Sequence, residues 1–273
     1  MVSTGGTAGS IRAANRERIT EAILQAARAQ LAERGASAIS LRAIARQLGM
    51  SSSAVYRYFP SRDELLTVLI IDAYDSLGAF VERAEKKVPR SDIAGRFRAI
   101  CRAVRSWALD NEHEYFLIYG SPVPGYKAPT DTIAPATRVA TLLLTLLAEA
   151  AGGSAATRLE DEVRGAAESP SKDVTADSPT ALERQLSVTG RPVRDPLPAA
   201  VVAAVAPVRA RLSAAISDAQ VVAALNMFSG LFGTISFELS GQLHNVVKEG
   251  KAARSAYFDA LIDSWLSQVG LEQ

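Results

Sequence analysis

The chain has 273 residues, of which 48% are hydrophobic and 22% charged, and its formal net charge is +1. This length exceeds one small domain, and the apolar content can bury a sizeable core, so we expect two domains. No run of 18 apolar residues is free of charge, and the N-terminus lacks a secretory signal pattern, which predicts a soluble cytoplasmic protein with no membrane partner. A single cysteine, Cys101, excludes an intrachain disulfide and a cysteine-cluster metal site.

Charge is unevenly distributed along the chain. Residues 1–62 contain nine arginines, no lysine and three glutamates, a net charge of +6, whereas the remaining residues carry 21 basic and 26 acidic side chains, a net charge of −5. A basic N-terminal part is typical of a domain that binds a polyanion. We expect residues 1–15 to be a flexible basic arm that adds phosphate or minor-groove contacts, the alternative being a solvated tail.

The first elements are three short helices. Residues 16–34 have apolar residues at helical spacing up to Gly35. A second helix begins after Ser40, a predicted N-cap, and ends near Gly49, which can adopt a left-handed conformation. A third helix is capped within residues 51–53, directs Val55 inward and is stopped before Pro60. The pair forms a helix-turn-helix, whose second helix presents its N-terminal part to the DNA major groove.

Longer helices follow. Ser61 and Glu64 form an S-x-x-E capping box, which predicts a helix from Arg62 to about residue 88. Residues 92–110 have an apolar stripe that includes the neighbourhood of Cys101, so we expect this thiol to pack in a core rather than to sense redox state. Further helices are expected at residues 133–150, 199–216, 218–243 and 252–269. Asp218 is the expected N-cap of the third of these. Residues 152–198 lack aromatic side chains and have five prolines, which predicts a mobile insertion.

The segment from Leu41 to Leu66, with the helix before it, closely resembles the tetracycline repressor (TetR) family of transcription regulators. The resemblance covers about a quarter of the chain. It implies an all-α fold, with an N-terminal three-helix DNA-binding domain at residues 16–62 and a helical ligand-binding and dimerisation domain at residues 63–273. The family's usual lysine is replaced by Arg62, which keeps the charge but changes its geometry.

The resemblance also implies site residues. Phosphate contacts would come from Ser40, Tyr56, Tyr58 and Arg62. Base contacts, or contacts to the flanking backbone, would come from Arg42, Ser52, Ser53 and Arg57. Among the aromatic residues of the motif, Phe59 is expected in the core and Tyr58 partly so. Tyr56 is therefore the principal predicted DNA contact.

Residues 111–126 are rich in aromatic side chains and end in a Pro-x-Pro-Gly-Tyr loop, which resembles the regulatory domain of one TetR subgroup. The expected ligand-binding residues are Trp107, Tyr115, Phe116, Tyr119, Tyr126 and Phe232, the alternative being that they only fill the core. By the same resemblance, the two C-terminal helices form a four-helix dimer interface that includes Leu225, Phe228, Leu239, Leu261 and Trp265. His113 lies between two glutamates, but consecutive helical residues diverge, so no metal or other cofactor is expected.

The predicted function is that of a homodimeric repressor, released from a near-palindromic double-stranded DNA operator by a small, largely apolar effector. No nucleophile elbow or phosphate-binding glycine loop supports catalysis, so no enzyme activity is expected. Three alternatives stay open: effector-assisted DNA binding or activation, a DNA-binding protein without an effector, and an enzyme or carrier that uses the helical cavity. The sequence leaves the operator, the regulated genes and the effector unspecified.

Overall fold

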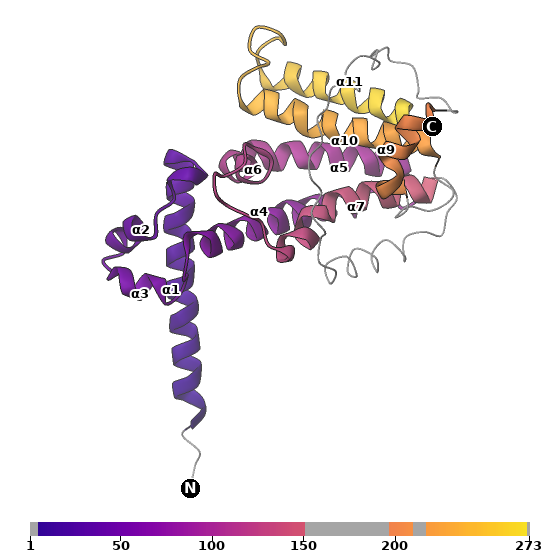
Figure 1. Cartoon of the computed structure of the whole chain (residues 1–273). Helices are drawn as coiled ribbons and strands as arrows, with labels where there is room; N and C mark the ends of the chain where they lie inside the picture. Colours follow the sequence, from indigo (N-terminus) through magenta and orange to yellow (C-terminus); the bar gives the residue numbers. More distant parts are fainter. Residues whose placement is uncertain (1–4, 151–196, 210–216, 272–273) are drawn as a thin grey trace. The chain divides into compact units, whose positions relative to one another are not determined.

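The computed structural model describes residues 5–150, 197–209 and 217–271, and these residues are helical with short connections (Figure 1). They divide into two compact units. The smaller unit contains the N-terminal residues up to Asp75 together with residues 111–132, and the larger contains residues 76–110 and the described residues from Ile133 onward. The expectation of an all-α fold is confirmed.

The smaller unit begins with α1 (Gly5–Arg34), which is followed by the short 3-10 turn η1 (Ala36–Ala38), α2 (Leu41–Gln47) and α3 (Ser52–Tyr56). The helix expected from residue 16 starts at Gly5, so residues 5–15 of the predicted arm are helical. The first part of α4 (Arg62–Glu85), α6 (Glu112–Tyr119) and η2 (Thr130–Thr132) complete the unit. Its core joins Ile23 and Leu31 of α1 to Ile44, Val55, Leu66 and Leu117.

The predicted serine N-caps in this unit are confirmed, including the Ser61 half of the expected capping box. Ser40 Oγ accepts from the Ala43 amide, Ser51 Oγ from the Ala54 amide and Ser61 Oγ from the Glu64 amide. Gly49 adopts the predicted left-handed conformation, with φ of 64°. Because these signals are local, α2, α3 and the start of α4 lie within a residue or two of their expected positions.

The larger unit contains the rest of α4, α5 (Ile93–Asp110), α7 (Ile133–Ala150), α9 (Ala199–Arg209), α10 (Asp218–Leu239) and α11 (Lys251–Val269). In Figure 1, α10 and α11 lie side by side, and α10 also contacts α5 and α9. The N-cap of α10 is Ser217 rather than the expected Asp218: its side chain and that of Gln220 form a capping box. The expected insertion at residues 152–198 falls, except for its last two residues, outside the described part.

Two segments, Thr130–Ala150 and α10, are long and apolar enough to cross a membrane by length and composition alone. Both also contain buried side chains. Buried side chains of α7 include Leu143, Leu146 and Leu147, and those of α10 include Met227 and Leu231. Their apolar surface is therefore used in part for packing within the larger unit.

Candidate nucleic-acid interface

The two helices of the helix-turn-helix pack closely on each other, and α2 also packs on α1. Val55 is fully buried and anchors α3, and Phe59, which follows the helix, is buried in the same core. The chain reverses at Gly49, where the Met50 amide donates to the carbonyl of Ala45 at 2.9 Å. This packing fixes one face of α3 and turns its other face outward.

Polar side chains cover the outward face of α3. Ser52, Ser53 and Arg57 are exposed, and Tyr56 keeps 41% of its surface accessible although it is aromatic. Arg42 on α2 is also exposed. Serine, tyrosine and arginine carry the donors and acceptors that meet base edges and phosphates. Five of the eight predicted DNA-contacting side chains thus lie exposed on the two helices of the motif or, for Arg57, at the C-cap of α3.

The remaining three are partly engaged within the protein. Ser40 caps α2, and its amide donates to Oε1 of Gln30 at 3.0 Å. Tyr58 is half-buried against the core, with the guanidinium carbon of Arg16 5.4 Å from its ring centroid. Arg62 is half-buried, and its guanidinium donates to backbone carbonyls between residues 36 and 39. The Arg62 guanidinium thus has hydrogen-bond partners within the smaller unit.

Four of the six predicted ligand-binding residues belong to the smaller unit. Tyr115 is fully buried, and its ring centroid lies 5.2 Å from that of Tyr119. Tyr74 meets Tyr119 edge to face at 5.9 Å and donates to the Ile118 carbonyl. Burial raises the pKa of both Tyr74 and Tyr119, so these phenols stay protonated and neutral at physiological pH. Tyr126 shares a hydrogen bond of 2.9 Å with Thr67.

Phe116 lines a half-open cavity of about 440 Å³ between the end of α1, η1 and the loop after α6. The cavity wall is largely apolar, with Leu31, Leu117 and Val123, and His113 also lines it. Among the described residues, no group of three histidine, cysteine or acidic side chains converges on a point where a metal ion could bind. The lining of this cavity is therefore mainly apolar.

The other two predicted ligand-binding residues, Trp107 and Phe232, are buried in the larger unit. The Trp107 indole donates to Ser76 Oγ at 3.0 Å, and the rings of Phe232 and Phe228 are 4.7 Å apart. Both side chains therefore have packing or hydrogen-bond partners within the larger unit.

The predicted dimer residues also separate into two groups. Leu225 is exposed, and Phe228, Leu239 and Leu261 are half-buried. Trp265 is buried within its own chain: it packs edge to face on Phe258, and a Cβ added at Gly230 would lie 3.1 Å from its indole nitrogen. Two exposed aromatic side chains lie on the same pair of helices, Phe237 at 57% and Tyr257 at 38% accessible, and neither was among the predicted dimer residues.

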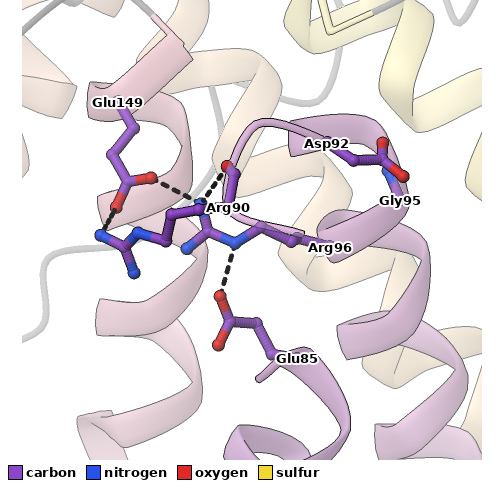
Figure 2. Close-up of polar contacts among 6 residues, drawn as sticks. All are labelled: Glu85, Arg90, Asp92, Gly95, Arg96 and Glu149. Carbon is purple, nitrogen blue, oxygen red and sulfur yellow. Dashed lines mark hydrogen bonds and ion pairs between the residues drawn. The ribbon is translucent and has the colours of Figure 1, made fainter. Parts of the chain in front are cut away.

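A buried ion cluster in the larger unit was also missed (Figure 2). Arg96 is 1% exposed, and its guanidinium donates to Glu85 and Glu149, each at 2.5 Å, and to the Arg90 carbonyl. The side chain of Arg90 also reaches Glu149. The cluster ties the ends of α4 and α7 to the start of α5. The sequence contains a signal for this cluster: Arg96 falls on the apolar stripe between Ile93 and Ile100, which indicates a buried charge that needs partners.

Comparison with known proteins places these features in a family. Residues 23–69 match bacterial regulatory proteins of the tetR family, and residues 97–265 match the tetracyclin repressor-like C-terminal domain. The chain is 54% identical over 125 residues to the HTH-type transcriptional regulators Rv1816 of Mycobacterium tuberculosis and Mb1846 of Mycobacterium bovis, which is 45% of this chain and 53% of each relative. The chain thus spans about half the length of these curated relatives. It is 39% identical over 79 residues to the HTH-type transcriptional repressor LfrR of Mycolicibacterium smegmatis, covering 29% of this chain and 41% of that protein.

Solved structures extend the similarity over most of the chain. The regulatory protein SCO4313 superposes with a TM-score of 0.64 at 28% identity, covering 93% of this chain and 97% of the other. A protein of unknown function from Rhodococcus sp. RHA1 shares the fold, with a TM-score of 0.54 at 21% identity over 89% and 93% of the two chains. The capped helix-turn-helix, the helical second unit and the matches to both family domains lead to one conclusion: the chain belongs to the tetR family of bacterial regulatory proteins.

Proposed function

We propose that this protein is a cytoplasmic, homodimeric transcriptional repressor that binds a near-palindromic operator and is released by a small, largely apolar effector. The observation that carries the proposal is the division of α3 into a buried face at Val55 and an exposed face of Ser52, Ser53, Tyr56 and Arg57. A helix so divided is held rigidly while its donors and acceptors remain available to DNA. Relatives named transcriptional regulators and a repressor support the same function.

The proposed contacts follow from exposure. Arg57, Ser52 and Ser53 meet base edges or the adjacent backbone, with Arg42 beside them on α2. Tyr56 donates its hydroxyl to a phosphate, and Ser40 and Tyr58 lie close enough to the motif surface to assist. Residues 1–62, with a net charge of +6, add sequence-independent attraction, since each neutralised phosphate releases counterions.

Dimerisation is proposed through the exposed faces of α10 and α11. On α10, Leu225 and Phe237 flank the small residues Ser229 and Gly233, and all four are exposed or half-buried. On α11, Tyr257 stands among exposed small residues, namely Ala256, Ala260 and Ser264. Small side chains let helices of two subunits approach closely, and the larger apolar side chains gain burial. Two recognition helices could then read half-sites roughly 34–36 Å apart.

Effector control is proposed through the aromatic side chains of both units: Tyr115, Phe116, Tyr119 and Tyr126 in the smaller and Trp107 and Phe232 in the larger. Their neutral, apolar character favours an uncharged ligand. An effector acts only if it binds the DNA-competent and DNA-incompetent states with different affinity, because equal affinity shifts no population.

The test is a titration of purified protein against fluorescent DNA from the region flanking its gene, with random DNA as control, over a salt series. We expect tight, sequence-preferring binding that weakens with salt and is abolished by Tyr56→Ala. Leu109→Ala is the matched control, because Leu109 is 40% exposed but lies on α5 in the larger unit. It should leave binding unchanged. If unbiased selection from random DNA also enriches no sequence, the proposal is wrong.

A further inference from the structure

The connection between α1 and α2 is held by side chains from two other places in the smaller unit. From α1, Gln30 Oε1 accepts the Ser40 amide at 3.0 Å. From the first turn of α4, the Arg62 guanidinium donates to three carbonyls: Nε to Ile39 at 3.2 Å, and Nη2 to Ala36 at 3.0 Å and Ser37 at 3.1 Å. Residues 35–40 are therefore fixed by contacts far apart in sequence.

The position of Arg62 makes these bonds informative. It is the first residue of α4, where the partial positive charge of a helix N-terminus disfavours a cation. The carbonyls of η1 and Ile39 offer partial negative charge in return. A guanidinium suits this site, because its planar donors can reach several oxygens at once, whereas a lysine ammonium is a single flexible point charge.

The held segment leads directly into the helix-turn-helix. Ser40 is the N-cap of α2, and Leu41, the first residue of that helix, is buried in the core. α2 in turn makes extensive contacts with α3, the helix that carries Tyr56 and is followed by Arg57 at its C-cap. A shift of residues 36–39 would be passed to α2 and from there to the exposed face of α3.

We propose that Arg62 is a positioning residue: it orients α2 and α3 for DNA by gripping the backbone of residues 36–39, and it is not a phosphate contact. The proposal rests on the proposed function, in which α3 meets DNA. In this proposal Arg62 differs from the phosphate-contacting role that the resemblance implied for this position.

The test compares Arg62→Met and Arg62→Lys with Arg46→Met, the control, because Arg46 is an exposed arginine on α2. Without DNA, amide hydrogen exchange of residues 36–40 should rise about tenfold or more in both Arg62 variants and stay unchanged in the control. With operator DNA, below the unfolding temperature of each variant, both Arg62 variants should bind about tenfold or more weakly than the parent. The slope of log affinity against log salt should stay at the parent value.

A phosphate contact gives a different pattern. Arg62→Met would then lower the salt slope by about 0.9, and Arg62→Lys, which keeps the charge, would bind like the parent. Either result overturns the proposal, as does unchanged amide exchange in Arg62→Lys. The exchange measurement needs no DNA. If the parent protein binds no operator, the proposed function fails, while the exchange data still decide whether Arg62 holds the segment.

Discussion

Gly78 of α4 lies directly against the guanidinium of Arg138 from α7: a Cβ added at Gly78 would lie 2.7 Å from Nε of Arg138. The same guanidinium pairs with Glu82, one turn further along α4, with Nη2 2.8 Å from the carboxylate. A glycine inside a helix costs about 1 kcal/mol relative to alanine. The close approach of Arg138 gives a physical reason for a glycine at this position.

Gly78→Ala should therefore have a background-dependent effect on stability. In an Arg138→Ala background the added methyl meets no guanidinium, and we expect a gain of about 1 kcal/mol in the free energy of unfolding. In the parent, the displaced Arg138–Glu82 pair should cancel much of that gain. Urea unfolding of the four proteins in the double-mutant cycle measures the difference. Equal gains in both backgrounds would show that Arg138 does not restrict Gly78.

The ion cluster around Arg96 allows a prediction with a control on the same helix. Arg96→Met leaves Glu85 buried without its partner, so the free energy of unfolding should fall by about 3–5 kcal/mol. Arg98→Met, two residues along α5, removes only the exposed pair with Asp263 and should cost about 0–1 kcal/mol. Both tryptophans, Trp107 and Trp265, lie in the larger unit, so their fluorescence in urea reports this unit.

A second variant checks the cause. Replacing both Arg96 and Glu85 with methionine removes the unpaired buried carboxylate, and the double variant should be more stable than Arg96→Met alone. Similar costs for Arg96→Met and Arg98→Met would instead mean that burial adds nothing to the Arg96 contacts.

The sequence predicted the helix-turn-helix well because its signals are local. Ser40, Gly49, Ser51 and Ser61 each decide a helix end through a cap or a left-handed turn within a few residues. The start of α1 was placed eleven residues late, since the prediction relied on apolar spacing that residues 5–15 do not have. The capping box of α10 was local as well, and Ser217 with Gln220 could have been identified from the sequence.

The candidate sites were less predictable because burial depends on distant partners. Arg62 reaches carbonyls more than 20 residues away, and the core position of Trp265 depends on Gly230 of another helix. Arg96 finds Glu149 from a separate helix. In each case helical periodicity places the side chain on a face, but only the packing of elements decides whether that face is core, interface or solvent.

Trp265 is buried whereas Phe237 is exposed, so substitutions at these two residues should affect folding and assembly separately. Trp265→Ala should remove about 3–5 kcal/mol from the free energy of unfolding, because a large buried side chain is lost from the core. Phe237→Ser should leave helix content and unfolding of the isolated subunit almost unchanged and shift the proposed dimer to monomer. Circular dichroism and sedimentation equilibrium measure the two effects. If Trp265→Ala were stable but monomeric, Trp265 would instead belong to the dimer interface.

Cys101 gives a prediction about alkaline pH. It is fully buried on α5, and burial raises the pKa of its thiol above the usual range. The unfolded chain releases this proton above a pKa of about 8.5, whereas the folded chain retains it, so the unfolded state binds fewer protons. The thiol's contribution to stability is thus fully present below about pH 8.5 and should fall by about 1.4 kcal/mol per pH unit above it.

The measurement is the free energy of unfolding of the parent and Cys101→Ala from pH 7 to pH 9.5. Other titrating groups are common to both proteins, so the difference between the two curves isolates the thiol. We expect that difference to be constant up to about pH 8.5 and then to change in favour of the alanine variant. Iodoacetamide, which needs the thiolate, should label the native parent far more slowly than the unfolded chain. Parallel stability curves together with rapid native labelling would instead indicate an accessible thiol suited to redox sensing.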